Sequence, residues 1–323
     1  GEYRISVRSD SHTIVDEATF TVKEDVDYSK DGRESDQQTA VNQFEDYSRG
    51  DFVQLSRADG FANYGEAVKA PEAAAYEMDE ETQAAVQASA AGYYDSSVYD
   101  NDGDEMPVMG EKNGVVLADL AGLSYDDEKW DALLDELSFK DMTTLVNVGG
   151  WQTAEIKSIE KRATSDCDGP AGLNNFVTGS YGTTFPSEVL MAQTWSKELA
   201  LEIGTSMGSE FAAAENYGWY GPAMNLHRSA FAGRNFEYFS EDGILSAYMA
   251  SNEQLGAAQW GVYSYIKHFV LNDQETNRCG ILLTYASEQA IRENYLKPFE
   301  KTVKNYTGKS LAVMAAYNWI GTK

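Results

Sequence analysis

Apolar and polar residues alternate through the first 25 positions of the chain. Tyr3, Ile5 and Val7 stand at every second position with polar residues between them, and a polar turn at 9–12 precedes further apolar residues at 13–15 and 20–22. A period of two residues predicts β-strands. Because a pair of strands cannot bury a core alone, we expect residues 1–25 to be the tail of a β-sandwich.

The following segment, residues 26–112, shows little periodicity. It contains alanine-rich stretches at 73–75 and 84–91 and the acidic run Tyr-Asp-Asn-Asp-Gly-Asp-Glu at 99–105. A polar segment without a regular apolar stripe offers little surface for a packed core. We therefore expect an acidic, irregular connector with one or two short helices.

From residue 113 the pattern becomes one of alternating helices and strands. Apolar spacings of three and four residues predict one helix around 130–137 and a second around 142–146 that ends at Gly149. The strand candidates that follow are Ala163–Cys167, Val189–Ala192, Trp219–Met224, Val262–Phe269 and Leu311–Ala316, and the helix candidates are 195–214, 244–260 and 287–305. Such alternation predicts a parallel α/β architecture.

The charge of the chain narrows the class of partner. The 323 residues carry a formal net charge of −27, and residues 1–110 alone hold 25 acidic and 8 basic side chains. Nucleic acids and anionic membrane surfaces select clustered Lys and Arg, so we expect neither as a partner. No apolar run approaches the roughly 18–20 residues of a membrane helix. A neutral or cationic partner remains.

Cysteine and histidine usage argues against a metal centre. Cys167 and Cys279 lie far apart and match no zinc-ligand spacing, so we expect two reduced thiols in a core, with one long-range disulfide as the alternative. The chain has three histidines and no HExxH motif. No GxGxxG or GxxxxGK[ST] motif follows a strand, which argues against a nicotinamide or phosphate site. We expect no metal and no cofactor.

Polar residues gather just after the predicted strands. Asp168 follows the first strand, Asn225 and His227 the third, Lys267 and His268 close the fourth, and Tyr317 follows the fifth. In a β/α barrel the loops after the strands build the active face. A turn explains Asp168-Gly-Pro alone. It does not explain Lys267 and His268, because a charge at the end of an apolar strand is costly without a partner.

Two longer motifs carry a family resemblance. Residues 233–242, GRNFEYFSED, and residues 267–278, KHFVLNDQETNR, resemble two signatures of family 3 glycoside hydrolases. Four further matches occur in the same order: Asp168-Gly-Pro-Ala-Gly, Asn225-x-His-Arg-Ser, Arg292 to Glu300, and Val313-Met-x-x-Tyr-Asn. The resemblance covers roughly residues 113–323. Upstream, residues 44–60 and the sandwich tail resemble permuted members, in which sandwich and fibronectin-like domains precede the barrel.

The resemblance implies a fold and a division of the chain. It implies an α/β protein with a (β/α)8-type, TIM-barrel-like catalytic domain at 113–323, of which only five or six of the eight strands are found here. Residues 1–25 then correspond to the tail of a fibronectin III-like sandwich, and residues 26–112 to the acidic connector. Because an unclosed parallel sheet leaves unpaired edges, we expect the chain to be a segment of a longer enzyme that needs the missing segments of the same polypeptide.

The implied activity is that of a retaining exo-β-glycosidase, most often a β-glucosidase acting on a β-glucoside or a short β-linked oligosaccharide. Asp168 resembles the carboxylate that accepts hydrogen bonds from the outer hydroxyls of the sugar, and Arg234, Lys267 and His268 resemble the donors. Met314 and Tyr317 resemble the wall beside the anomeric carbon. Glu275 resembles a group that orients Lys267 or Arg234.

Structural explanations compete with these roles. Arg234 could pair with Glu237 or Asp242 as a staple of its own loop. Met314 and Tyr317, at strand spacing, would ordinarily be barrel core. Glu237 and Asp242 are expected to organise their loop.

The two catalytic carboxylates are not assigned. The resemblance places the nucleophilic aspartate downstream of Lys323 and the acid/base upstream of Gly1. The alternatives are therefore a catalytically incomplete sugar-binding or scaffold protein of the same fold, and a β-xylosidase. The continuation after Lys267-His268 argues against an N-acetylglucosaminidase. A bacterial, cytoplasmic protein is favoured, with secretion as the alternative, and a homo-oligomer is possible.

Overall fold

A computed structural model describes residues 1–35, 37–39, 41, 55, 59–69, 72, 77–90, 96–98, 101–305 and 311–321. The chain divides into two compact units, Gly1–Asp46 and Tyr47–Lys323, and each is described by itself. The upstream part of the family resemblance, residues 44–60, lies mostly outside the described residues. The boundary expected at residue 112 stays a prediction.

The first unit contains a β-hairpin. Strand β1 (Glu2–Arg8) pairs antiparallel with β2 (Ile14–Thr21), as the alternation predicts. Tyr3 lies opposite Phe20 and their rings stack with centroids 5.3 Å apart. Ile5 and Val7 continue the same face, and these side chains are exposed. The two strands are confirmed, whereas their membership of a fibronectin-like sandwich stays a prediction.

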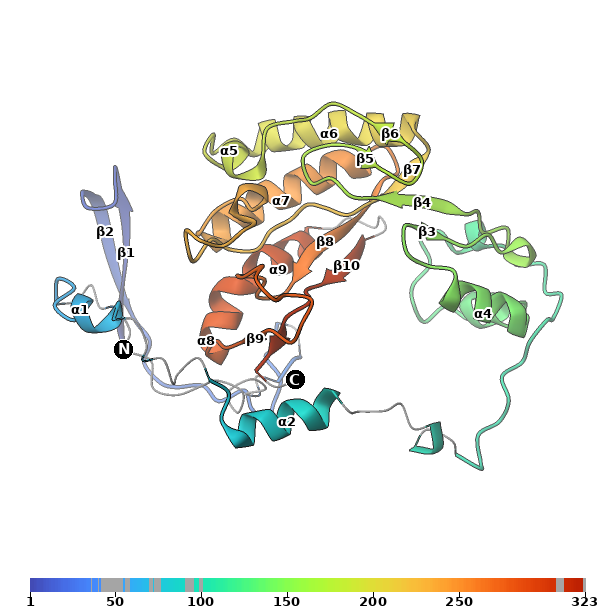
Figure 1. Ribbon diagram of the computed structural model, residues 1–323, viewed down its shortest axis with the longest axis horizontal. Helices are drawn as coiled ribbons and strands as arrows, with labels where there is room; N and C mark the ends of the chain where they lie inside the picture. Colours follow the sequence, from blue (N-terminus) through green and yellow to red (C-terminus); the bar gives the residue numbers. More distant parts are fainter. Residues whose placement is uncertain are drawn as a thin grey trace. The chain divides into compact units, whose positions relative to one another are not determined.

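The second unit is an α/β structure around a curled five-stranded sheet (Figure 1). The strand order is β10 (Leu311–Ala315), β8 (Tyr263–Phe269), β7 (Asn216–Trp219), β4 (Thr164–Cys167) and β3 (Gln152–Thr153). Neighbouring strands are parallel from β10 to β4, and β3 is antiparallel to β4. The described strands thus form a curled half-barrel sheet, with fewer strands than the eight of a closed barrel.

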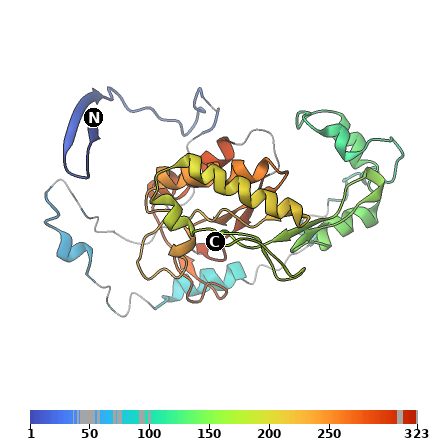
Figure 2. The ribbon, with the colours of Figure 1, turned by 90° about the horizontal axis from the view of Figure 1, so that it is seen from above.

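Long helices cover this sheet. Helix α6 (Lys197–Ala213) packs on β7, and α7 (Gly243–Ala258) packs on β8 and against both α6 and α9 (Lys297–Lys304), as Figures 1 and 2 show. The α6–α7 contact depends on small residues, since a Cβ on Gly204 would lie 2.0 Å from the carbonyl oxygen of Glu253. Backbones this close exclude any larger residue at Gly204.

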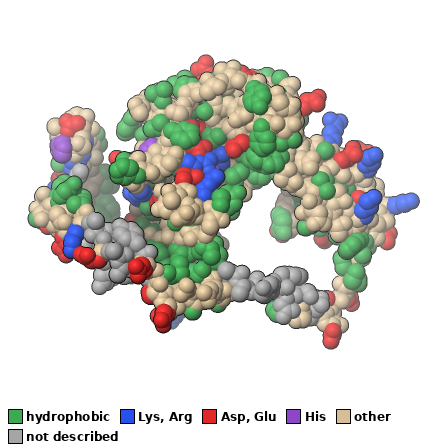
Figure 3. All heavy atoms as spheres, in the orientation of Figure 1, with side chains coloured by type: hydrophobic (Ala, Val, Ile, Leu, Met, Phe, Trp, Pro, Cys, Tyr) green, Lys and Arg blue, Asp and Glu red, His purple; other side chains and the backbone are tan. Residues whose placement is uncertain are grey.

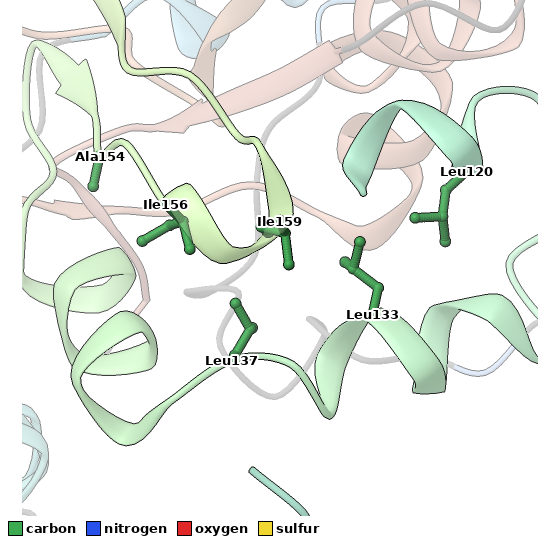
Figure 4. Packing of buried hydrophobic residues seen from close by; sticks show 6 residues of the cluster. All are labelled: Leu120, Leu133, Leu137, Ala154, Ile156 and Ile159. Atoms are coloured by element: carbon green, nitrogen blue, oxygen red, sulfur yellow. The ribbon is translucent and has the colours of Figure 1, made fainter. Parts of the chain in front are cut away.

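Residues 113–160 form a smaller apolar cluster of their own. Helix α3 (Lys129–Leu134) and α4 (Phe139–Asn147) are the two predicted helices, and Ser138 caps the start of α4. The buried residues of this cluster, drawn in Figure 4, are Leu120, Leu133, Leu137, Ala154, Ile156 and Ile159. This cluster holds the segment with helices α3 and α4 next to the first strands of the sheet.

The remaining helices and strands are short. They are α1 (Tyr64–Ala67), α2 (Glu80–Ala90), η3 (Ser96–Val98), η4 (Leu117–Leu120), η5 (Lys157–Ile159), β5 (Asn174–Asn175), β6 (Ser180–Tyr181), α5 (Glu188–Ala192), η6 (Asn235–Glu237), β9 (Leu283–Thr284), α8 (Glu288–Ala290), η7 (Ile291–Tyr295) and β11 (Trp319–Ile320). None of the described helices is both long and apolar enough to cross a membrane.

Two strand predictions need correction. The segment 189–192 belongs to helix α5, and its buried residues Glu188, Met191 and Ala192 have the spacing of a helical face. Strand β7 begins earlier than predicted and ends at Trp219, because Pro222 cannot donate to a ladder. The other strand predictions and the helices at 195–214 and 244–260 are confirmed. The helix predicted at 287–305 is divided into α8, the π-helical η7 and α9.

Candidate active site

Asp168 and Lys267 meet at one edge of the sheet. Asp168 directly follows β4, and Lys267 lies near the end of β8, with β7 between the two parallel strands. Lys267 Nζ lies 2.8 Å from Asp168 Oδ1. The lysine side chain is only 2% exposed, whereas that of Asp168 is 45% exposed. The Lys267 ammonium is therefore held in the protein interior, and the Asp168 carboxylate is accessible to a ligand.

The turn after Asp168 fixes the direction of its carboxylate. Gly169 has a φ of +118°, and a Cβ there would lie 1.9 Å from the carbonyl oxygen of Gly172, so the position requires glycine. The Gly169 N–H donates to Asp168 Oδ1 at 2.9 Å, and Trp219 Nε1 donates to the Gly169 carbonyl at 3.0 Å. Burial raises the pKa of Asp168, but Lys267, the Gly169 N–H and Arg234 more than offset this and leave the pKa below its ordinary value.

A second carboxylate, Glu237, joins two cations in the same place. It ends the short helix η6, and its Oε1 accepts a hydrogen bond from Nε of Arg234. Its Oε2 lies 4.0 Å from Lys267 Nζ, and its side chain is 6% exposed. Asp168, Arg234, Glu237 and Lys267 are called the charged cluster below. It has two positive and two negative groups.

The structure shows which carboxylate pairs with Arg234, a choice between Glu237 and Asp242 that the sequence left open. Arg234 contacts Glu237, as the loop-staple explanation predicts, while Asp242 caps helix α7 by accepting from the N–H groups of Ile244 and Leu245. The Arg234 side chain is nevertheless 17% exposed. Its guanidinium is positioned by Glu237 and keeps donors for a ligand.

His268 is held in place on both its backbone and its side chain. Its N–H donates to Asn225 Oδ1 at 2.8 Å, and its carbonyl accepts from Asn225 Nδ2 at 2.9 Å. Nδ1 lies 3.1 Å from the hydroxyl of Tyr238, which also accepts from Asn272 Nδ2 at 2.7 Å. Burial and the positive charges of Arg234 and Lys267 lower the pKa of His268 to about 2, so the imidazole is neutral.

Glu275 pairs with a third cation, Arg278, which the sequence analysis did not consider. It pairs with Arg278 at 3.0 Å and accepts from Asn272 Nδ2 at 3.0 Å. The guanidinium carbon of Arg278 lies 5.2 Å from the ring centroid of Tyr317. Among the described contacts, the residue that touches both Arg234 and Lys267 is Glu237. A role for Glu275 in orienting either cation stays a prediction.

Met314 and Tyr317 lie on and after the neighbouring strand β10. Met314 is half-buried, and Tyr317 is 62% exposed. Val313 pairs with Ile266 and Ala315 with Phe269, so the pairing of β10 with β8 is irregular at Met314, where Lys267 and His268 lie on the neighbouring strand. The predicted role of Met314 and Tyr317 as a wall beside the anomeric carbon stays a prediction.

Sequence reasoning missed a polar layer beneath the charged cluster. Tyr263 and Tyr265 donate to the two oxygens of the buried Asp166, at 2.5 and 2.9 Å. These tyrosines and Lys267 occupy every second position of β8, a spacing that was available in the sequence. The layer joins β4 to β8 one step below the pair of Asp168 and Lys267.

The charged cluster suits a neutral, hydroxyl-rich ligand. Open carboxylate oxygens accept from hydroxyls, and cationic groups donate to them. Figure 3 shows basic and acidic side chains next to one another in the α/β region. Among the described residues, no group of three or more His, Cys, Asp or Glu side chains is placed to hold a metal ion.

Comparison with known proteins identifies the family of the chain. Residues 133–322 match the model of the N-terminal domain of glycosyl hydrolase family 3. The chain belongs to this family. The match includes the whole charged cluster and its supporting strands. It leaves the hairpin and residues 26–112 outside.

Relatives of the family 3 chain include proteins named β-glucosidases. A β-glucosidase of Ruminococcus albus is 36% identical over 228 residues, which are 66% of this chain and 23% of the relative. A solved structure of β-glucosidase 3B from Thermotoga neapolitana with α-D-glucose is 38% identical, with a TM-score of 0.53 over 60% of this chain and 30% of that one.

A β-glucosidase structure from Paenibacillus barengoltzii has a TM-score of 0.58 at 30% identity, and covers 68% of this chain and 24% of that one. The family 3 chain therefore spans about a quarter of the length of the curated relatives it matches.

Proposed function

We propose that this chain supplies the sugar-binding side of a retaining exo-β-glycosidase, specifically a β-glucosidase that hydrolyses terminal non-reducing β-D-glucosyl residues. The observation that carries the proposal is the contact between the open carboxylate of Asp168 and the buried ammonium of Lys267. The β-glucosidase names of the relatives and the glucose complex of the Thermotoga neapolitana enzyme support it.

Each member of the site has a defined task in this proposal. Asp168 accepts hydrogen bonds from two sugar hydroxyls, while Lys267 and Arg234 donate to hydroxyl oxygens from fixed positions. Such charge-assisted bonds contribute on the order of 1.5–3 kcal/mol each. His268 is a neutral ring held in place by its contact with Tyr238, so it supplies a hydrogen bond without adding charge. Fixed donors and acceptors orient the sugar before the bond is broken.

The chemical step needs two carboxyl groups about 5–5.5 Å apart across the anomeric carbon. One forms a covalent bond to that carbon as the acid protonates the leaving oxygen, and water then releases the sugar. Asp168 and Glu237 are both paired to buried cations, which suits binding better than these roles. We place the nucleophile and the acid/base in other parts of the polypeptide, as family resemblance implies. The hairpin of the first unit would then end a fibronectin III-like domain.

The test is hydrolysis of an aryl β-glucoside and the matching aryl β-xyloside by the full-length protein that contains this chain, with wild-type Asp168 and with Asp168→Asn. We expect glucoside hydrolysis to be faster than xyloside hydrolysis, and to fall at least about 100-fold in the variant. Faster xyloside hydrolysis would make the protein a β-xylosidase. Binding of glucose without hydrolysis of either substrate would support a sugar-binding scaffold instead.

A further inference from the structure

Two glutamates on contacting helices are buried near the charged cluster without obvious partners. Glu188 on α5 is 1% exposed, and Glu253 on α7 is fully buried. In the described part of the chain, none of their four carboxyl oxygens has a hydrogen-bond partner from another residue. A buried polar group without a partner is rare and costly, so these two need an explanation.

The position of Glu188 connects the pair to the sugar-binding residues. Glu188 and Glu237 line the same cavity of about 410 Å³, together with residues 169–172 of the turn that follows Asp168. Helix α5 contacts both η6, which ends in Glu237, and α7, which carries Glu253. Glu188 is therefore close to the groups that hold Lys267.

The charges around Glu188 leave no counter-ion for it. The groups that act on it are Glu237 from η6, Glu253 from α7 and Lys267 from β8. Lys267 is already paired with Asp168 and shared with Glu237, while Arg234 is paired with Glu237. Two ionised carboxylates added here would give the interior two uncompensated negative charges. The stable alternative is that both carry a proton near neutral pH.

The titration of the pair agrees with its geometry. Burial and the negative charge of Glu237 raise the pKa of Glu188 to about 8, although the positive charge of Lys267 partly offsets them. Burial and the neighbouring Glu188 raise the pKa of Glu253 well above its ordinary value. A neutral Glu188 can donate its proton where an ionised one would repel Glu237.

We propose that Glu188 is a positioning residue of the sugar site, uncharged when sugar binds, and that its ionisation weakens sugar binding. This inference rests on the proposed function. An ionised Glu188 attracts the Lys267 ammonium and repels the Glu237 carboxylate. Both effects draw the Lys267 ammonium away from Asp168 and disturb the hydrogen bond that Arg234 donates to Glu237. The sugar then loses donors at fixed positions.

The test is glucose binding to the full-length protein by calorimetry between about pH 6 and about pH 9.5, for wild type and Glu188→Gln. Gln keeps the shape of a protonated carboxyl but cannot ionise. We expect the wild-type affinity for glucose to fall about tenfold as the pH rises. A change of this size corresponds to a difference of about one unit in the pKa of Glu188 between the free and the glucose-bound protein. Glu188→Gln should bind as wild type does at low pH and lose less affinity at high pH.

A second readout follows the proton itself. Infrared difference spectra between low and high pH should show the carbonyl band of a protonated carboxyl in the wild type, and a weaker band in Glu188→Gln and in Glu253→Gln. The exposed Glu241→Gln is the control and should leave the band unchanged. The carboxyl band of the wild type is measured without any substitution. The protonation of Glu188 and Glu253 is therefore tested even if a variant fails to fold.

Each outcome has one meaning. Glucose binding whose pH profile is the same in wild type and Glu188→Gln overturns this inference and leaves the proposed function intact. A missing carboxyl band in the wild type also overturns it. No glucose binding at any pH overturns the proposed function, and with it this inference.

Discussion

The ammonium of Lys267 lies 2.8 Å from the carboxylate of Asp168, although 99 positions separate the two residues. The parallel pairing of β4 and β8 with the intervening β7 brings them together. One partner is buried and the other is open to solvent. This asymmetry makes the pair suitable for binding, because the buried charge fixes a carboxylate that still has capacity for hydroxyl groups.

Glu237 should be the residue of the charged cluster most important for stability. Glu237→Gln removes the charge that faces Arg234 and Lys267 in a site where the carboxylate is 6% exposed. Breaking a buried ion pair from one side costs about 3–5 kcal/mol. We expect a loss in this range in the free energy of unfolding from urea denaturation. The exposed Glu241→Gln should stay within about 0.5 kcal/mol of wild type, and equal losses in both variants would refute the assignment.

His268 should make the protein less stable as the medium becomes acidic. Burial, with Arg234 and Lys267, lowers its pKa to about 2 in the folded protein, whereas an unfolded imidazole binds a proton near pH 6.5. Between these values the unfolded state binds more protons, so stability falls as the pH decreases below about 6.5. His268→Gln should reduce the loss between pH 6.5 and 5 by about 2 kcal/mol. An unchanged pH slope in urea denaturation would contradict this.

The α6–α7 contact should tolerate no side chain at Gly204. A Cβ there would lie 2.0 Å from the carbonyl oxygen of Glu253, and the backbone of α7 cannot move without disturbing the buried carboxyl pair. We expect Gly204→Ala to destabilise the protein by about 3 kcal/mol and to lower its melting temperature by several degrees.

Gly65 on α1 provides the matched control. Nothing lies within 4 Å of a Cβ at that position, and alanine is a better helix former than glycine. Gly65→Ala should leave the melting temperature unchanged or raise it slightly. A decrease as large as that of Gly204→Ala would show that the glycine-dependent contact is not the cause.

The two cysteines should differ sharply in reactivity. Cys167 is fully buried and burial raises its pKa to about 12, whereas Cys279 is exposed, and both are free thiols. The core position expected for both is thus correct for Cys167 and wrong for Cys279. Alkylation of the folded protein followed by peptide mass mapping should find Cys279 modified and Cys167 intact. Modification of both at equal rates would contradict the burial of Cys167.

Sequence predicted the parts of the site that depend on local pattern. Apolar strands followed directly by charged residues placed Asp168 and Lys267 at one edge of a parallel sheet. The pairing of Arg234 could not be predicted, because Glu237 and Asp242 stand in the same motif. The structure resolves it by using Asp242 as the cap of α7.

Other features depend on tertiary context. The apolar run at 189–192 fits a short strand or a buried helix equally well, and packing of Glu188, Met191 and Ala192 selects the helix. The burial of Glu188 and Glu253 has no signature in the sequence, because each stands in a segment where an exposed glutamate would be ordinary. Only the fold brings their helices, α5 and α7, into contact near the charged cluster.

The most direct measurement of the central claim is calorimetric titration of the full-length protein with glucose at neutral pH, comparing wild type with Asp168→Asn and Lys267→Gln. Loss of a charge-assisted hydrogen bond costs on the order of 1.5–3 kcal/mol, so each variant should bind about 10- to 150-fold more weakly. The exposed Lys129→Gln should bind as wild type does. Wild-type affinity in Asp168→Asn and Lys267→Gln would contradict the account.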